Sequence, residues 1–174
     1  MVLAARNADV DALNARAQQI RRAVGEFGTE RTYALPSGDR LTLAEGDAVR
    51  VRANDYRSRR GQGPDLLNGY RAVVSQLSED GRVEVTWRTR ERGQDDAYVS
   101  AWLTPEQIAG GALSLGYAMT IAASQGMTCD TSLMYGHGAN AFAAYPGLTR
   151  GEEGESPVAA ARGHRERGHP GSAR

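Results

Sequence analysis

Leu41-Thr42-Leu43, Val49-Arg50-Val51 and Val83-Glu84-Val85-Thr86-Trp87 alternate apolar with polar residues, which is the pattern of strands buried on one face. Asp80-Gly81 stands between residues 73–77 and the last of these stretches and is a strong hairpin signal. Short strands joined by tight turns would leave two exposed edges in an open sheet. We therefore predict a small closed β-barrel over residues 35–102.

The residues before this β segment have a helical period. Val2–Ala4 is a short apolar run typical of a buried strand, and Asn7 or Asp9 then offers an N-cap for a helix. Apolar residues recur at helical spacing after that cap, and Gly25 and Gly28 are expected to end the helix.

Helical patterns return after the β segment. Thr104-Pro105 is a helix start, with Thr as the cap and Pro at the first position. We predict a helix over Gly116–Gly126, a strand over Thr131–Tyr135, and a helix over Ala139–Tyr145. The chain is then an α/β layer interrupted by an inserted β module. Residues 151–174 hold almost no large apolar side chain, and we predict a disordered tail.

Composition excludes several classes of protein. The chain has 174 residues, and its 21 basic residues are all Arg, balanced by 21 acidic residues. Without Lys it cannot by itself supply the P-loop ammonium that contacts ATP phosphates, nor form a Schiff base. Cys129 stands alone, which excludes an internal disulfide and fits a cytoplasmic protein. His137, His164 and His169 have no metal-ligand spacing, so we predict no metal site. No apolar run is long enough for a signal peptide or a membrane span.

Positive charge gathers in the β segment. Residues 48–92 contain ten Arg and six acidic residues, a local excess of four positive charges. The sharpest cluster, Arg57, Arg59 and Arg60, stands in a Gly-containing loop. Two readings stay open: a solvated loop, or a loop whose Arg donors contact the phosphates of single-stranded DNA.

Three motifs in order resemble a helicase family. Gly116-Tyr-Ala-Met-Thr-Ile-Ala-Ala-Ser-Gln-Gly-Met-Thr-Cys-Asp130 resembles motif V of RecD-like superfamily 1 helicases, in particular the helicase half of MobF-type conjugative relaxases. Ala144–Gly151 resembles motif VI of that group, and Val2–Asn14 resembles the opening of its second RecA-like domain. The β segment lies where these helicases carry an inserted SH3-like module.

The resemblance implies a division of the chain. Residues 1–34 and 103–150 would form a partial RecA-like domain of the P-loop NTPase type, and residues 35–102 an SH3-like β-barrel inserted in it. The expected continuation after Gly151 is replaced by Glu152-Glu153-Gly154, so we expect the sheet to lack its final strand.

The resemblance also implies roles for single residues. Arg150 would be the catalytic arginine that reaches the γ-phosphate of ATP and stabilises its developing charge. Two further groups of roles follow: nucleotide binding by Gly126, Thr128 and Arg6, and DNA binding by Thr120, Ser124 and Gln125. Ala122 and Ala123 replace a His and a Lys that are common in the motif.

The first RecA-like domain of such helicases has no counterpart in the sequence. ATP and Mg²⁺ would therefore bind only together with a P-loop-containing helicase half, and we predict that the chain by itself neither hydrolyses ATP nor unwinds DNA. The alternative, from another class of function, is a non-enzymatic module that binds single-stranded nucleic acid through its basic barrel.

Overall fold

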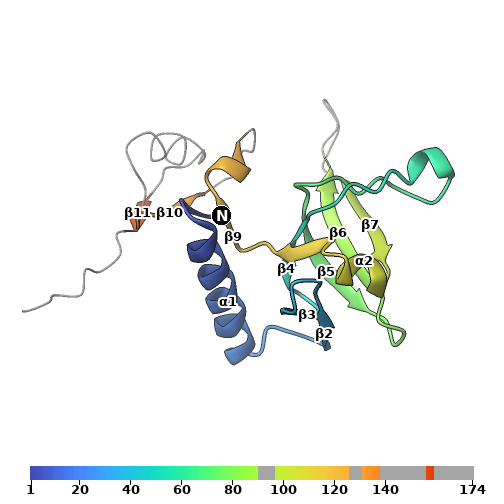
Figure 1. Ribbon diagram of the computed structural model, residues 1–174, viewed down its shortest axis with the longest axis horizontal. Coiled ribbons are helices and arrows are strands. Elements are labelled where there is room, and N and C mark those ends of the chain that lie inside the picture. The colour runs from blue at the N-terminus through green and yellow to red at the C-terminus, as the bar shows by residue number, and fades with distance from the viewer. Residues whose placement is uncertain (90–96, 126–130, 138–155, 159–174) are drawn as a thin grey trace, which may run out of the picture.

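Two lobes lie side by side in the computed structural model, which describes residues 1–89, 97–125, 131–137 and 156–158 (Figure 1). The first lobe holds a parallel sheet and a long helix. The second holds the antiparallel strands of the middle of the chain. The chain enters the second lobe after the helix and returns to the first after residue 115.

The parallel sheet has the strand order β11-β10-β1-β9. Its strands are β1 (Val2–Ala4), β9 (Ala118–Thr120), β10 (Leu133–Tyr135) and β11 (Ser156–Val158), and each neighbouring pair is parallel. A small core of Leu3, Met119, Ile121 and Met134 belongs to this lobe. The strands predicted at residues 2–4 and within residues 131–135 are confirmed.

Helix α1 (Asn7–Ala23) packs on this sheet. Its N-cap is Arg6, which is extended and makes no side-chain cap, so the predicted caps at Asn7 and Asp9 are wrong. Asn7 and Asp9 are both inside the first turn, where Asp9 accepts hydrogen bonds from the Arg6 side chain. The helix ends as predicted near Gly25, whose φ of +74° is the left-handed conformation that glycine adopts freely.

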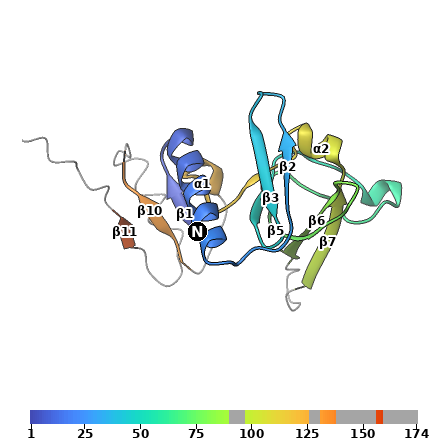
Figure 2. The same cartoon turned by 90° about the horizontal axis from the view of Figure 1, so that it is seen from below.

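The second lobe is built on a five-stranded antiparallel sheet with the order β7-β6-β5-β4-β8. Its strands are β4 (Ala48–Val51), β5 (Arg71–Leu77), β6 (Val83–Thr89), β7 (Ala97–Leu103) and β8 (Leu113–Leu115). A separate hairpin pairs β2 (Glu30–Ala34) with β3 (Arg40–Ala44). Figure 2 shows this hairpin between α1 and the strands of the large sheet.

Three short helices are found among the described residues, two in the second lobe and one after β9. They are η1 (Ser58–Arg60), α2 (Pro105–Ala109) and η2 (Ala122–Ser124). Helix α2 begins as predicted, since Thr104 and Gln107 form a reciprocal capping box with Pro105 at the first position. The hairpin predicted at Asp80-Gly81 is confirmed by the pairing of β5 with β6.

One apolar core fills the second lobe, and every strand contributes alternate residues to it. Val49, Val51, Val74, Val85 and Leu113 are each at most 2% exposed. The hairpin shares this core through Tyr33, Leu41 and Leu43. Among the described residues, however, the hydrogen-bonded ladder is an open row of five strands and the hairpin pairs only with itself. Strands β2 and β8 belong to this lobe although they lie outside residues 35–102.

Two predicted elements differ in the structure. Residues 116–125 form strand β9 and the short helix η2 in place of the predicted helix, because Ala118 and Met119 are buried in a parallel ladder beside β1. Within the tail predicted to be disordered, Ser156–Val158 adds an edge strand to β10, so the sheet does not end at β10. Pro157 has no N–H, which suits an edge position. The helix predicted at 139–145 lies outside the described residues.

Candidate nucleic-acid interface

A cleft of about 420 Å³ runs between the two lobes. Asn7, Asp11, Thr120 and Ala123 line it on the side of α1 and the parallel sheet, and Arg50, Arg52 and Ser114 line it on the side of β4 and β8. The cleft thus brings the first turn of the helix and the motif V-like segment against arginines of the inserted sheet. Segments more than 100 residues apart in sequence meet there.

The helix side of the cleft is fixed by one asparagine. Asn14 is 7% exposed, and its amide binds both backbone groups of Ala118: Nδ2 donates to the carbonyl at 3.2 Å and Oδ1 accepts from the N–H at 2.8 Å. These two hydrogen bonds give partners to backbone groups on the side of β9 that has no neighbouring strand. It also sets the distance between α1 and the residues that follow β9.

A buried carboxylate joins the two lobes. Asp47, in the turn before β4, is fully buried and accepts hydrogen bonds from Gln18 Nε2 at 2.7 Å and from the Ala44 N–H at 2.8 Å. It also accepts from the hydroxyl of Tyr117. Because Gln18 is on α1 and Tyr117 precedes β9, the Asp47 side chain connects the second lobe to both parts of the first lobe.

Tyr117 and Arg21 extend the junction. Burial, together with the Asp47 carboxylate, raises the pKa of Tyr117 to about 12. Arg21 Nη1 donates to the Tyr117 hydroxyl at 3.1 Å and to the Gly46 carbonyl at 2.9 Å. The guanidinium also lies 5.0 Å from the centre of the Phe27 ring. The junction is therefore a hydrogen-bonded network.

Gly116 lets the chain cross between the lobes. A Cβ at this position would lie 2.7 Å from the carbonyl carbon of Val49 and 3.1 Å from the backbone nitrogen of Arg50. Only glycine allows so close an approach of two backbones. The first residue of the motif V-like segment is thus required by packing against β4.

Arg50 is the most unusual side chain of the cleft. Its Nε is buried and has no hydrogen-bond partner among the described residues. Burial lowers the pKa of Arg50, and the neighbouring charge of Arg52 lowers it further. A buried donor without a partner costs free energy, so this guanidinium is suited to an anion in the cleft.

The predicted DNA-binding residues of the motif V-like segment differ in accessibility. Thr120 lines the cleft, and its Oγ1 accepts from the Ala123 N–H at 3.1 Å. Ser124 is fully buried, and its hydroxyl donates to the Ile121 carbonyl at 2.8 Å. Gln125 is exposed. In this structure Thr120 and Gln125 can reach a ligand, while Ser124 shapes the turn that carries them.

Arg6 lies at the carboxyl edge of the parallel sheet, where α/β proteins commonly bind ligands. Its guanidinium forms a two-point ion pair with Asp9, at 2.8 and 3.0 Å, and contacts Nδ1 of His137, which follows β10. The hydrogen bond from Arg6 lowers the pKa of Asp9. The predicted nucleotide-binding arginine is therefore held by a carboxylate and a histidine of its own chain.

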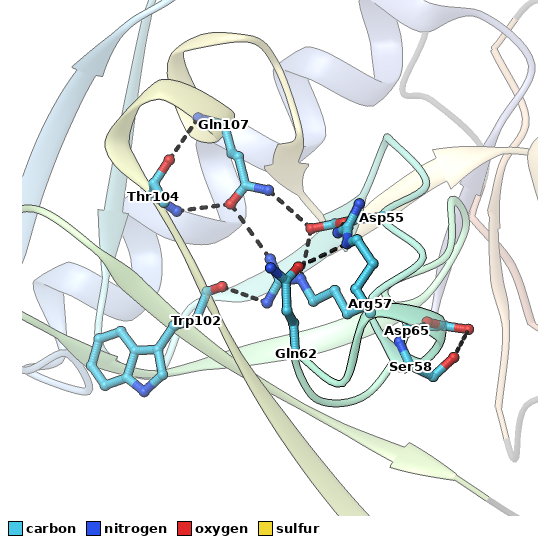
Figure 3. Close-up of polar contacts among 9 residues, drawn as sticks. Asp55, Arg57, Ser58, Gln62, Asp65, Trp102, Thr104 and Gln107 are labelled. Carbon is cyan, nitrogen blue, oxygen red and sulfur yellow. Dashed lines mark hydrogen bonds and ion pairs between the residues drawn. The ribbon is translucent and has the colours of Figure 1, made fainter.

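Most of the predicted basic loop is committed to internal contacts (Figure 3). Arg57 donates to Asp55 at 2.6 Å and to the Trp102 carbonyl at 2.7 Å, and its side chain is 11% exposed. Arg60 pairs with the other oxygen of Asp55 at 2.5 Å. Gln107 donates to the same carboxylate at 3.0 Å. Burial raises the pKa of Asp55, but the hydrogen bonds from both arginines lower it by more.

Arg59 differs from its two neighbours. It is exposed and forms no side-chain hydrogen bond or ion pair with any described residue. Of the three arginines predicted to contact phosphates, Arg59 alone has its guanidinium available in this way. Arg150, Gly126 and Thr128, predicted to bind nucleotide, lie outside the described residues.

The sequence reading did not single out the arginines on the outer face of the large sheet. Arg50 alternates with the buried Val49 and Val51, and the same period places Arg71 outside. An arginine between two apolar residues of an alternating strand predicts a positive charge on the outer face of the sheet, so this signal was present in the sequence. The strand pairing that brings these arginines together could not be predicted from it.

Solved structures of Pif1 helicases have a similar fold. A Bacteroides Pif1 crystal structure bound to ssDNA matches with a TM-score of 0.57 and 21% identity, covering 90% of this chain and 40% of that one. The Bacteroides Pif1 helicase in complex with ADP-AlF3 and ssDNA matches with a TM-score of 0.57 at 20% identity, covering 90% of this chain and 39% of that one. The Pif1 helicase of Candida albicans gives a TM-score of 0.57 at 18% identity, with 90% and 44% covered.

These matches show a helicase-like fold, and the chain spans about two fifths of the length of the first matched protein. No family model matches the sequence, and no curated protein is a significant match. Within the described ranges, no helix is long and apolar enough to cross a membrane. The same residues hold no group of three His, Cys, Asp or Glu side chains arranged for a metal ion.

Proposed function

We propose that this chain is part of the second motor domain of a superfamily 1 DNA helicase, of the RecD-like type found in conjugative relaxases, with an inserted SH3-like module. The observation that supports this most strongly is the match of 90% of the chain to Pif1 helicases bound to ssDNA. The cleft between the lobes would take single-stranded DNA. Thr120 and Gln125 would contact the strand, and Ser124 would support the turn that carries them.

ATP would bind at a different place, between this domain and a P-loop-containing half from the same or another chain. Arg150 would be the catalytic arginine, stabilising charge on the γ-phosphate, and Gly126, Thr128 and Arg6 would lie near the nucleotide. ATP and Mg²⁺ need a P-loop Lys and acidic metal ligands, and the sequence contains no Lys. We propose that the chain is inactive as an ATPase without that other half.

The test is a reconstitution. The full chain is mixed with a P-loop-containing RecA-like half, and ATP hydrolysis is measured with and without oligo(dT). DNA-stimulated turnover is expected in the mixture and its loss in Arg150→Ala, while Arg16→Ala, an exposed change on α1, keeps the rate. Turnover by the chain alone that disappears in Arg150→Ala would contradict the proposed inactivity. A mixture that binds DNA but shows no stimulated turnover would contradict the motor function.

A second candidate function is a non-enzymatic module that binds single-stranded nucleic acid. Arg50 supports it, because it lines the cleft and its buried Nε has no partner among the described residues. Both functions predict DNA binding with strong salt dependence. Restored ATP hydrolysis separates them, since a passive module would bind DNA without stimulating any P-loop half.

A further inference from the structure

A row of arginines crosses the outer face of the five-stranded sheet. Arg50 of β4 pairs directly with Arg71 of β5 on one side and with Ser114 of β8 on the other. Arg88 of β6 pairs with Tyr98 of β7. These five residues, one on each strand, are called the arginine row below.

The arginine row is continuous across the sheet. The register pairs Val73 with Thr86. Two residues further along this antiparallel pair, Arg71 lies opposite Arg88. Both arginines line the same shallow pocket. Directly paired residues in an antiparallel ladder point to the same face, and neighbouring strands are about 4.8 Å apart. Three guanidinium groups therefore start from adjacent strands.

One end of the arginine row opens into the cleft. Arg50 and Ser114 line the cleft together with Thr120 and Arg52. The other end is Tyr98, whose side chain is 74% exposed. A ligand could thus run from the motif V-like segment, over β4 and β5, to an exposed aromatic ring.

Stability does not explain why Arg50 and Arg71 are paired. Like charges directly opposite each other destabilise a sheet, and the register places Arg50 directly opposite Arg71. Arg50, Arg52 and Arg71 form no side-chain hydrogen bond or ion pair within the described part of the chain. Glu84 is the one acidic residue of the described strands β4 to β8, and it accepts from Ser75 at 2.8 Å.

We infer that the arginine row is a phosphate track for single-stranded nucleic acid, leading the strand from the cleft across the inserted sheet to Tyr98. Spaced positive charges suit a backbone that carries one phosphate per nucleotide. An exposed aromatic ring at the end of the row suits an unpaired base, which stacks without regard to sequence. The inference rests on the proposed DNA binding and assigns it to residues that neither the motifs nor the basic loop contain.

The test measures binding of fluorescent oligo(dT) to the full chain over a series of NaCl concentrations. The double variant Arg50→Gln, Arg71→Gln is compared with the double variant Arg16→Gln, Arg40→Gln, which removes the same charge around a hollow that neither Arg50 nor Arg71 lines. We expect the row variant to weaken binding about tenfold or more and to lower the salt slope by about 1.4, since each phosphate contact on a single strand contributes about 0.7. The control pair should change the slope little.

Tyr98 provides an independent readout. Tyr98→Ala should weaken oligo(dT) binding about fivefold or more and leave the salt slope unchanged, because stacking releases no counterion. Tyr98→Phe should bind like the native chain. Thermal unfolding of each variant confirms that it is folded.

The outcomes separate the two proposals. Equal binding by the row variant and its control overturns the phosphate track and leaves the helicase function standing. A loss confined to the row variant, with no restored ATP hydrolysis in the reconstitution, supports the track and contradicts the motor. Binding of polyglutamate is measured in the same way. If the row variant loses polyglutamate binding as strongly as oligo(dT) binding, the row takes acidic peptides, and the assignment to nucleic acid is overturned. No binding of oligo(dT) by the native chain overturns the track as well.

Discussion

Two groups of arginines in the second lobe look alike in sequence but differ in the partners of their side chains. Arg57 and Arg60 share the Asp55 carboxylate, and Arg57 also caps the Trp102 carbonyl. Arg50 and Arg71 face each other across β4 and β5 with no such partner among the described residues. Arg57 and Arg60 tie the loop to the rest of the lobe, while Arg50 and Arg71 remain available to a ligand. Positive charge marks a binding surface only where the fold leaves it without a counter-charge.

The largest expected effect is the loss of stability in Arg57→Ala. This change leaves Asp55 paired with Arg60 alone, and the Trp102 carbonyl loses the hydrogen bond that Arg57 donates to it. We expect a loss of about 2–3 kcal/mol in the free energy of unfolding, measured by urea denaturation. Oligo(dT) affinity per folded molecule should stay within about twofold. A large loss of affinity with no loss of stability would reverse the roles of the two groups.

Asp55→Asn tests the same cluster from its acidic side. It should cost about 1–2 kcal/mol of stability and free Arg57 and Arg60 for other anions, so oligo(dT) binding should rise severalfold. The folded-state pKa of Asp55 is lowered, so its stabilisation is present above pH of about 4 and is lost as pH falls through that lowered pKa. Urea titrations across this acidic range should show a shallower loss in the Asn variant. Identical acid profiles would contradict the account.

Tyr117 extends the comparison to the junction, where Arg21 is also partnered. Its folded-state pKa is raised from 10.0 to about 12. Stability from this group is therefore complete below pH 10 and falls as pH rises toward 12. Tyr117→Phe should cost about 1–2 kcal/mol at neutral pH and remove part of the alkaline loss, as measured by urea denaturation at several pH values. An unchanged alkaline profile would show that another group titrates there.

The smallest expected effect has the opposite sign. Arg71→Ala removes one member of a like-charge pair, so the free energy of unfolding should stay level or rise by about 0.5 kcal/mol. Urea denaturation at low and high salt checks this, because screening should erase the gain. A loss of more than about 1 kcal/mol would mean that Arg71 contributes to stability in a way the row does not explain.

Local patterns predicted much of the fold. Thr104-Pro105, the Asp80-Gly81 hairpin and the alternation that buries Trp87 each depend on a few neighbouring residues, and the structure confirms all three. The helix expected at 116–126 failed for a physical reason. Apolar residues spaced four apart also fit a short buried strand followed by a tight turn, and pairing with β1 favours the strand.

The candidate site was harder to predict because it depends on long-range pairing. Arg57 reads as an available charge in sequence, but its partners Trp102 and Gln107 are 45 and 50 residues away. Arg50 and Arg71 read as ordinary polar positions of two strands. Only the register of β4 with β5 makes them neighbours. Thr120, which the helicase resemblance selected, does line the cleft.

Photocrosslinking compares the two groups of arginines in a single experiment. Tyr98 lies at the end of the arginine row and Tyr56 lies beside the basic loop, and their side chains are 74% and 53% exposed. Oligo(dT) carrying 5-iodouracil is crosslinked to the full chain, and the modified residue is identified by mass spectrometry. The account predicts crosslinks at Tyr98 that disappear in the Arg50→Gln, Arg71→Gln variant. Crosslinks at Tyr56 with none at Tyr98 would contradict it.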